Sequence, residues 1–317
     1  LITGITGQDG SYLAEFLLEK DYEVYGIVRR TSTPTGWRLE GIEDELNFVT
    51  ADMRDEHSLI RAMREIEPDE IYNLAAQSFV GSSWDIPVQT AEVDAMGALK
   101  MLEAYRSIVP EARFYQASTS EMFGDVNAEI RDESTSFKPS NPYGISKLMA
   151  HEMTRNYRES FDLDACSGIM FNHESSRRGI EFVTRKVTDA VAKIYLGEQE
   201  YLKIGDMDPE RDWGYAPDYV RAMWKMLQQE SGEFEDYVIA TGETHTVREL
   251  VKTAFSAVGI ENWQDYVEQE EEYMRPVEIE ALKGDSSKAR EELDWQPETT
   301  FEEMIKEMVE IDIERNS

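Results

Sequence analysis

Tyr143 and Lys147 stand four residues apart at the expected start of a helix. Such a spacing places two side chains on the same face of a helix. A phenol with a pKa of about 10 is a poor base at neutral pH until a cation stabilises its phenolate. We therefore expect the ammonium group of Lys147 to lower the pKa of Tyr143 and to hold the ribose of a bound cofactor.

Glu121 follows three hydroxyl residues, Ser118, Thr119 and Ser120, at the end of the strand expected before this helix. An alcohol dehydrogenase needs a hydroxyl group, a tyrosine and a lysine, because hydride and proton leave one carbon-oxygen unit. The additional carboxylate predicts a second proton abstraction, next to the new ketone. On a hexose, Glu121 would remove the C5 proton so that the enolate expels water from C6. The alternative is that Glu121 only caps or solvates the loop.

A glycine-rich turn at residues 3–10 follows the first expected strand and opens a helix. Glycines in such a turn let the backbone approach a pyrophosphate, and the helix N-terminus supplies amide donors. A glycine pattern alone is weak, but the order of strand, turn and helix favours a dinucleotide site over an ordinary turn. The expected contacts are Gly4, Thr6, Gly7, Gln8, Asp9 and Gly10.

Arg29 and Arg30 end the second expected strand, where an NAD site usually carries an acid for the ribose hydroxyl. Two guanidinium groups fit a 2′-phosphate through forked, charge-assisted hydrogen bonds, so the sequence predicts NADP. The alternative is a pair of solvated surface arginines. Further cofactor contacts are expected after the third and fourth strands, at Asp52, Met53, Leu74, Ala75, Ala76 and Ser78.

Short β-rich runs alternate with helical patterns through the first half of the chain. The expected strands are 1–3, 23–28, 47–50, 70–74, 113–117 and 164–171. Parallel neighbours need crossover helices, so this alternation predicts a Rossmann-type α/β fold with a doubly wound parallel sheet. We expect 1–171 to bind the cofactor and carry the catalytic residues, and 172–317 to form a smaller α/β substrate-binding lobe with excursions back to the first domain. Leu1 falls inside the first expected strand, so further residues are expected before it.

The 317 residues carry a formal charge of −33, with 65 acidic and 32 basic side chains. Such a surface repels nucleic acid and anionic lipid, so neither is an expected partner. A solvated, carboxylate-rich surface is the preferred interpretation, with adaptation to high salt as a hypothesis. The single cysteine, Cys166, indicates a reducing compartment, and no apolar run reaches membrane-spanning length, so we expect a cytoplasmic protein. The four histidines are widely separated, and no metal is expected.

The sequence resembles the GDP-mannose 4,6-dehydratase family nearly end to end. The matching segments are GITGQDGSYLAE at 4–15, RR at 29–30, YQASTSE at 115–121, Tyr143 with Lys147, FNHES at 171–175, RRG at 177–179, FVTRK at 182–186, RDWG at 211–214 and RP at 275–276. The resemblance implies that GDP-mannose loses water to give GDP-4-keto-6-deoxymannose, with NADP regenerated in each turnover. Three positions depart from the usual pattern, so the resemblance does not fix cofactor packing or sugar orientation there: Gln89, Ser176 and Trp84.

The family pattern also implies roles for individual residues. Tyr143 takes the proton of the C4 hydroxyl, Thr119 hydrogen-bonds the same oxygen, and Glu121 assists the elimination. His173 and Arg178 are implied to lie near the cofactor. The implied contacts of the nucleotide diphosphate are Asn172, Lys186, Arg211, Arg275 and Glu278.

Two other functions remain open at this point. One is another nucleotide-sugar enzyme on the same scaffold, a 4-epimerase or a dehydratase of a dTDP- or UDP-hexose, although an epimerase does not need Glu121. The other is a non-catalytic NADP-binding sensor, which the intact set of catalytic residues disfavours. The helices between Pro87 and Tyr105 and after Tyr143 commonly pair subunits in this superfamily, so a homodimer or homotetramer is expected. The loop after Arg30 is also expected to reach a neighbouring subunit.

Overall fold

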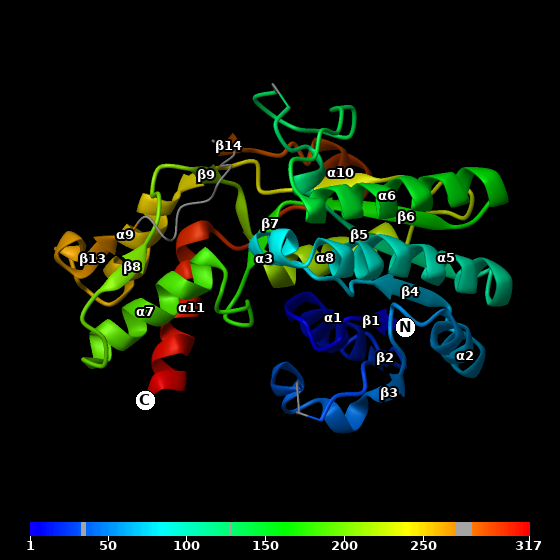
Figure 1. Cartoon of the computed structure of the whole chain (residues 1–317), viewed down its shortest axis with the longest axis horizontal. Helices are drawn as coiled ribbons and strands as arrows, with labels where there is room; N and C mark the ends of the chain where they lie inside the picture. The colour runs from blue at the N-terminus through cyan, green and yellow to red at the C-terminus, as the bar shows by residue number, and fades with distance from the viewer. Residues whose placement is uncertain (33–35, 127, 271–280) are drawn as a thin grey trace.

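A seven-stranded parallel sheet forms the centre of the larger lobe in the computed structural model, which describes residues 1–32, 36–126, 128–270 and 281–317. The strand order is β11-β6-β5-β4-β1-β2-β3 (Figure 1). The bounds are β1 Ile2–Thr3, β2 Tyr25–Val28, β3 Asn47–Thr50, β4 Glu70–Asn73, β5 Arg113–Thr119, β6 Ala165–Met170 and β11 Tyr237–Ile239. The predicted Rossmann-type sheet is confirmed, and each of the six expected strands has its counterpart in it.

Helices cover both faces of this sheet, as parallel connections require. On one face α1 packs against α8, and on the other α2, α5 and α6 lie together. The bounds are α1 Gln8–Leu18, α2 Glu56–Ile66, α5 Gly97–Ile108, α6 Pro142–Phe161 and α8 Ala216–Met226. The α6 helix starts where it does because Pro142 fits the first turn and the side chain of Asn141 accepts the amide of Gly144.

A π turn interrupts the helical stretch that precedes β5. Helix α4, Pro87–Ala91, runs into the π turn at Glu92–Met96, and α5 continues from Gly97. A π turn adds one residue to the helical repeat, and such turns often occur at functional sites. Here it buries Asp94, which is 2% exposed.

The second lobe has its own apolar core, built from α7 Val183–Leu196, α9 Val247–Ala257 and α11 Phe301–Asn316. Small sheets complete it: β8 Leu202–Ile204 with β13 Val267–Gln269, β9 Glu210–Arg211 with β12 His245–Thr246 and β14 Ala281–Leu282, and β7 Asn172–Glu174 with β10 Trp213–Tyr215. The last helix, α11, buries Phe301, Met304, Ile305 and Met308 in this core. A capping box of Thr300 and Glu303 starts that helix.

Two elements from the second half of the chain return to the large sheet. Strand β11 pairs with β6, and α8 packs on α1. The remaining elements are α3 Val80–Asp85, α10 Ser287–Glu292 and short 3-10 turns at Trp37–Leu39, Glu43–Glu45, Ser120–Met122 and Trp263–Tyr266. Among the described residues, no helix is both long and apolar enough to cross a membrane.

Candidate active site

A cavity of about 910 Å³ opens at the carboxyl ends of the central strands, between the large sheet and the second lobe. This is where ligands bind in open α/β sheets. The structure brings the following predicted residues together in its wall: Gly4, Thr6, Gly7, Gln8, Asp9, Gly10, Arg29, Asp52, Met53, Leu74, Ala75, Ala76, Ser78, Thr119, Glu121, Tyr143, Lys147, Asn172, His173, Arg178, Lys186 and Arg211. Arg30 is exposed and is not part of the wall. Arg275 and Glu278 lie outside the described residues.

The glycine-rich turn has no room for side chains at two positions. Gly4 has a φ of +71°, and a Cβ there would lie 3.0 Å from the backbone nitrogen of Ala75. A Cβ on Gly10 would lie 2.3 Å from the carbonyl oxygen of Gly4. The turn therefore keeps its backbone and the first amides of α1 open toward the cavity, which is the cradle that a dinucleotide pyrophosphate requires.

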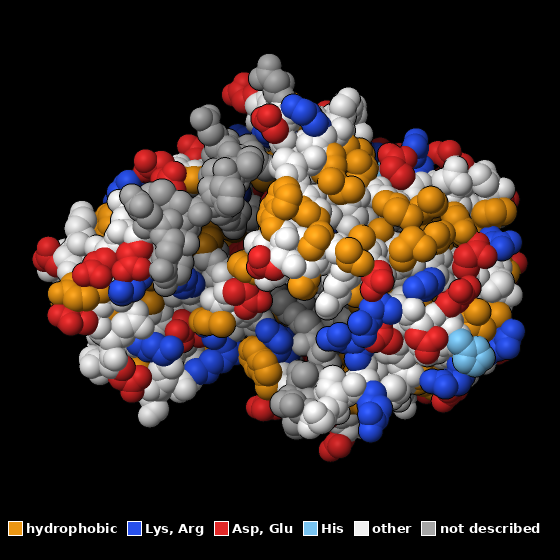
Figure 2. Space-filling model, viewed as in Figure 1, with side chains coloured by type: hydrophobic (Ala, Val, Ile, Leu, Met, Phe, Trp, Pro, Cys, Tyr) orange, Lys and Arg blue, Asp and Glu red, His pale blue; other side chains and the backbone are white. Residues whose placement is uncertain are grey.

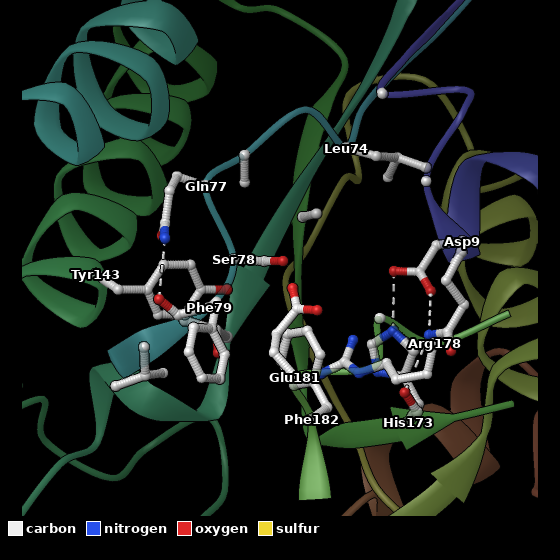
Figure 3. Close-up of a pocket in the computed structure, with 18 of the residues that line it drawn as sticks. Asp9, Leu74, Gln77, Ser78, Phe79, Tyr143, His173, Arg178, Glu181 and Phe182 are labelled. Carbon is white, nitrogen blue, oxygen red and sulfur yellow. Dashed lines mark hydrogen bonds and ion pairs between the residues drawn. The ribbon is translucent and has the colours of Figure 1, made fainter. Parts of the chain in front are cut away.

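Asp9 and the buried His173 form an ion pair that joins α1 to β7 (Figure 3). Nε2 of His173 lies 2.9 Å from Oδ2 of Asp9, and Nδ1 lies 2.7 Å from the carbonyl oxygen of Phe171. Burial alone would raise the pKa of Asp9, but His173 outweighs it and holds this pKa at about 2. Burial would lower the pKa of His173, but the Asp9 carboxylate raises it above its ordinary value. The pair thus places an imidazole with a raised pKa beside the glycine-rich turn.

Arg29 and Asp52 are both predicted to contact the adenosine part of the cofactor, but only Asp52 is held by another side chain in the part of the protein that the structure describes. Arg29 lines the cavity and is exposed. The carboxylate of Asp52, expected to meet the adenine edge, is held by Arg54, whose Nη2 and Nε lie 2.8 Å and 3.1 Å from its two oxygens. The hydrogen bonds from Arg54 lower the pKa of Asp52 to about 2. The sequence gives no sign of this local ion pair because Arg54 follows Asp52 in an irregular turn.

Arg38 also lines the cavity, and sequence reasoning missed it. Its Nε donates to the carbonyl oxygen of Arg177 at 2.7 Å, and its Nη1 donates to that of Thr6 at 3.3 Å. These contacts place a guanidinium group beside the glycine-rich turn. An isolated arginine in a short 3-10 turn carries no spacing signal that could have revealed it.

Tyr143 and Lys147 face the cavity from the first turns of α6. Nζ of Lys147 donates to the carbonyl oxygen of Ala117 at 2.7 Å and lies 6.0 Å from the centre of the Tyr143 ring. Burial raises the pKa of Tyr143 and Asp94 raises it further, whereas a hydrogen bond with Thr119 lowers it. The expected lowering of this pKa is therefore not found in this structure, because loss of water from around the phenol outweighs the opposing contacts.

Glu121 is fixed on the same side of the cavity by the residue that caps α6. Nδ2 of Asn141 donates to Oε2 of Glu121 at 2.8 Å, and the amide of Glu121 donates to Oγ1 of Thr119 at 3.3 Å. A Cβ on Gly144 would lie 2.7 Å from the carbonyl oxygen of Glu121, so glycine here lets α6 approach the Glu121 turn. Phenol, ammonium and carboxylate consequently share one cavity.

Asp94 is a further charged group beside this constellation, and the sequence did not indicate it. Its Oδ1 accepts the amide of Gln77 at 2.7 Å, while its Oδ2 is buried without a hydrogen-bond partner in the described structure. Burial raises the pKa of Asp94 to about 6, against the opposing effect of Lys147. Asp94 lies within the π turn, and the sequence pattern indicates neither this turn nor the burial of the side chain.

Replacing Asp94 with asparagine should stabilise the protein at pH 8 and leave its stability at pH 4 nearly unchanged. Since the folded-state pKa lies above the ordinary value, ionisation of Asp94 opposes folding increasingly from about pH 4 to pH 6 and fully above that. A carboxyl pKa of about 6 in place of 3.8 corresponds to at most about 3 kcal/mol. Urea unfolding of both proteins at the two pH values measures the difference. An equal change at both would mean that ionisation of Asp94 is not responsible.

The second lobe supplies the other end of the cavity. Asn172 on β7, Lys186 on α7 and Arg211 on β9 all reach its wall. Lys186 and Arg211, together with Arg29, Arg38, Lys147 and Arg178, give the wall six basic side chains against six acidic ones, whereas the whole chain has 32 against 65. This suits ligands that carry phosphate groups. Among the described residues, no group of three or more His, Cys, Asp or Glu side chains is arranged to hold a metal ion.

Comparisons with known proteins give consistent results. The family model for GDP-mannose 4,6 dehydratase matches residues 1–308. The chain is 51% identical to GDP-mannose 4,6 dehydratase 1 of Arabidopsis thaliana, over 99% of this chain and 89% of that protein. It is 46% identical to GDP-mannose 4,6 dehydratase of Homo sapiens, over 99% of this chain and 91% of that protein. Among solved structures, the Thermus thermophilus UDP-glucose 4-epimerase complex with NAD is similar, with a TM-score of 0.85, 27% identity and coverage of 98% of this chain and 97% of that one.

Proposed function

The chain belongs to the GDP-mannose 4,6-dehydratase family, and from this premise we propose that it dehydrates GDP-mannose to GDP-4-keto-6-deoxymannose with NADP. The observation that carries the proposal is the meeting of Thr119, Glu121, Tyr143 and Lys147 in the cavity that also contains the glycine-rich turn. NADP held in this cavity would supply the hydride chemistry at C4 and C6 of the hexose. The sugar thus loses one water with no net redox change.

The residues of the chain move the protons of this reaction. Tyr143 accepts the proton of the C4 hydroxyl while Thr119, which also bonds Tyr143, orients the same oxygen. Lys147 stabilises the phenolate and holds the nicotinamide ribose. Glu121, held by Asn141, removes the C5 proton and gives it to the C6 hydroxyl, which leaves as water. When hydride returns to C6, one proton is added to C5, which balances the proton that Tyr143 took from the C4 hydroxyl. The order is fixed chemically, because the C5 proton becomes acidic only once C4 is a ketone.

The remaining predicted residues bind the two ligands. The glycine-rich turn, Asp52 to Met53, the Leu74 to Ala76 segment, Ser78, His173 and Arg178 surround NADP. Asn172, Lys186 and Arg211 hold the diphosphate of the substrate, together with Arg275 and Glu278 from the segment outside the described residues. Forked guanidinium donors and ammonium groups suit these oxygens.

Incubation of the purified protein with GDP-mannose and NADP tests the proposed function. Mass spectrometry should show a sugar nucleotide that has lost one water, and NADP should remain oxidised at the end. UDP-glucose and dTDP-glucose should give much less product. A UDP-hexose that is epimerised without loss of mass, with GDP-mannose unchanged, would instead support the 4-epimerase alternative. An absence of turnover with every nucleotide-hexose would support the sensor alternative.

Replacing Arg29 with alanine should weaken NADP binding about 10- to 100-fold and leave NAD binding nearly unchanged. The guanidinium group lines the cavity just after β2, and in our proposal it pairs with the 2′-phosphate that only NADP carries. Titration calorimetry with both dinucleotides measures the effect. Arg64→Ala, which removes an exposed arginine on α2, is the matched control. Equal losses for NADP and NAD would place Arg29 elsewhere than at the 2′-phosphate.

We propose a homo-oligomer that pairs through an apolar patch on α3, α4 and α6. Figure 2 shows hydrophobic side chains gathered over this side of the larger lobe. Exposed members include Trp84 at 58%, Val88 at 71% and Ile145 at 57%. Patches of this kind mark protein interfaces, and the neighbouring helices are those that pair subunits in the superfamily.

Replacing Val88 with aspartate should therefore convert the oligomer to a smaller species. A buried, unpaired charge in an interface is strongly destabilising, so dissociation is expected at micromolar concentration. Light scattering after gel filtration measures the mass. Tyr195→Asp is a matched control, because Tyr195 is an exposed apolar residue of α7 in the other lobe. A wild-type protein that is monomeric, or a variant with unchanged mass, would contradict the patch as an interface.

The two lobes have different roles in the proposed enzyme. Residues 1–171 bind NADP and carry the catalytic groups, and 172–317 mainly bind the nucleotide sugar, although His173 and Arg178 reach NADP and both β11 and α8 return to the large sheet. A cytoplasmic location fits the single cysteine, because Cys166 is buried and unpaired and no disulfide within the chain can form.

A further inference from the structure

Glu174 is a buried carboxylate in the cavity wall that the chemistry described so far does not use. It is the last residue of β7, directly after His173, and its side chain is 3% exposed. Moving a carboxylate out of water costs several kcal/mol unless partners compensate for it. A charge kept at such a cost next to two ligand-binding residues needs an explanation.

Two side chains hold the Glu174 carboxylate, and one of them lines the cavity as well. The hydroxyl of Thr184, in the first turn of α7, donates to Oε2. Nε of Arg178 lies 3.2 Å from the same oxygen, which makes an ion pair without hydrogen-bond geometry. The guanidinium carbon of Arg178 also lies 3.6 Å from the centre of the Phe182 ring. Arg178 is therefore held by a charge at its inner nitrogen and by a ring against its face.

This arrangement leaves the outer end of Arg178 directed at the middle of the cavity. Figure 3 shows Arg178 between Phe182 and His173. Arg178 lines the same cavity as the glycine-rich turn and Tyr143. The two Nη groups make no hydrogen bond to any residue that the structure describes.

Two other carboxylates in the cavity could pair with Arg178 in place of Glu174. Asp9 and Glu181 both line the cavity, and pairing with Asp9 would break the contact between Asp9 and His173. Pairing with Glu181 would draw the guanidinium group away from the glycine-rich turn. An anchor on the inner nitrogen prevents both, while the forked outer nitrogens stay turned toward a ligand.

We propose that Glu174 is a positioning residue, which fixes Arg178 so that its Nη groups meet the diphosphate of the bound dinucleotide between the glycine-rich turn and Tyr143. This rests on the proposed function, since it deepens the cofactor site of that enzyme. Thr184 fixes the carboxylate in turn, and Phe182 limits the guanidinium group to one plane.

The test is Glu174→Gln, which keeps the size and the oxygen that accepts from Thr184 but removes the charge. Calorimetry should show NADP binding weakened about tenfold and GDP binding changed less than about twofold. Arg178→Ala should weaken NADP binding at least as much. Adding Glu174→Gln to Arg178→Ala should then cause no further loss, because Glu174 acts through Arg178.

Other outcomes would overturn the assignment. If NADP and GDP binding fall together with the melting temperature, Glu174 is only structural. If Glu174→Gln costs as much in the Arg178→Ala background, it does not act through Arg178. Should Glu174→Gln fail to fold, Thr184→Val is used: a smaller loss of NADP binding that vanishes in the Arg178→Ala background is expected, and a loss that persists there would overturn the proposal. Product formation by the wild-type enzyme tests the proposed function separately.

Discussion

A Tyr143→Phe enzyme should turn over GDP-mannose about a thousandfold more slowly than the wild type while binding NADP and GDP with unchanged affinity. The substitution removes the one oxygen that accepts the C4 proton and leaves the ring in its buried place. General acid-base groups contribute about 10²- to 10⁴-fold to rate, and oxidation at C4 precedes every other step. No reduced cofactor should accumulate, because the block comes before hydride transfer. Stopped-flow absorbance of the nicotinamide together with product mass measures both effects.

Tyr115 provides a matched control for this substitution. It is fully buried, its hydroxyl oxygen has no hydrogen-bond partner in the described structure, and it does not line the cavity. Tyr115→Phe therefore removes an oxygen from a similar interior and should keep activity within about twofold. A Tyr143→Phe enzyme that retained a tenth of wild-type turnover would show that another group accepts the C4 proton.

The sequence allowed much of the larger lobe to be predicted, because its signals are local. Alternating short apolar strands and amphipathic helices admit few arrangements other than a parallel sheet, and the glycine-rich turn lies where a strand meets a helix. The sequence did not predict that β11 pairs with β6, because Tyr237–Ile239 is a short apolar run that could be any buried strand. Its pairing depends on contacts distant along the chain.

The residues of the candidate site could be predicted where they belong to a motif with fixed spacing. Residues that reach the site only through the packing of the fold could not. Asp94 enters the site only because a π turn rotates it inward, and Glu174 gains its partners from α7 and the turn before it. The spacing of Tyr143 and Lys147 also led to a wrong prediction of the phenol pKa. It predicted a lowered pKa for Tyr143, but burial and Asp94 raise it. Depth and long-range neighbours, which spacing does not encode, therefore control the acid-base properties of the site.

Glu121→Gln should block the reaction after C4 oxidation, which makes it distinguishable from Tyr143→Phe. The amide oxygen can still accept from Nδ2 of Asn141, so the side chain should keep its place, but it cannot take a proton from C5. Hydride transfer to NADP remains possible because Tyr143, Thr119 and Lys147 are intact. Mixing enzyme, NADP and GDP-mannose should give a burst of reduced nicotinamide that decays slowly, with turnover reduced about 10²- to 10³-fold.

The matched control is Glu133→Gln, because Glu133 is a half-buried glutamate that accepts the amide of Val238 and lies outside the cavity wall. Its activity should remain near that of the wild type. In deuterated water, wild-type product should carry deuterium at C5, whereas Glu121→Gln should show little exchange there. Unchanged turnover, or unchanged exchange at C5, would remove Glu121 from the elimination. A variant that forms no reduced cofactor at all would mean that Glu121 is needed before the ketone forms, which would relocate its role to the oxidation step.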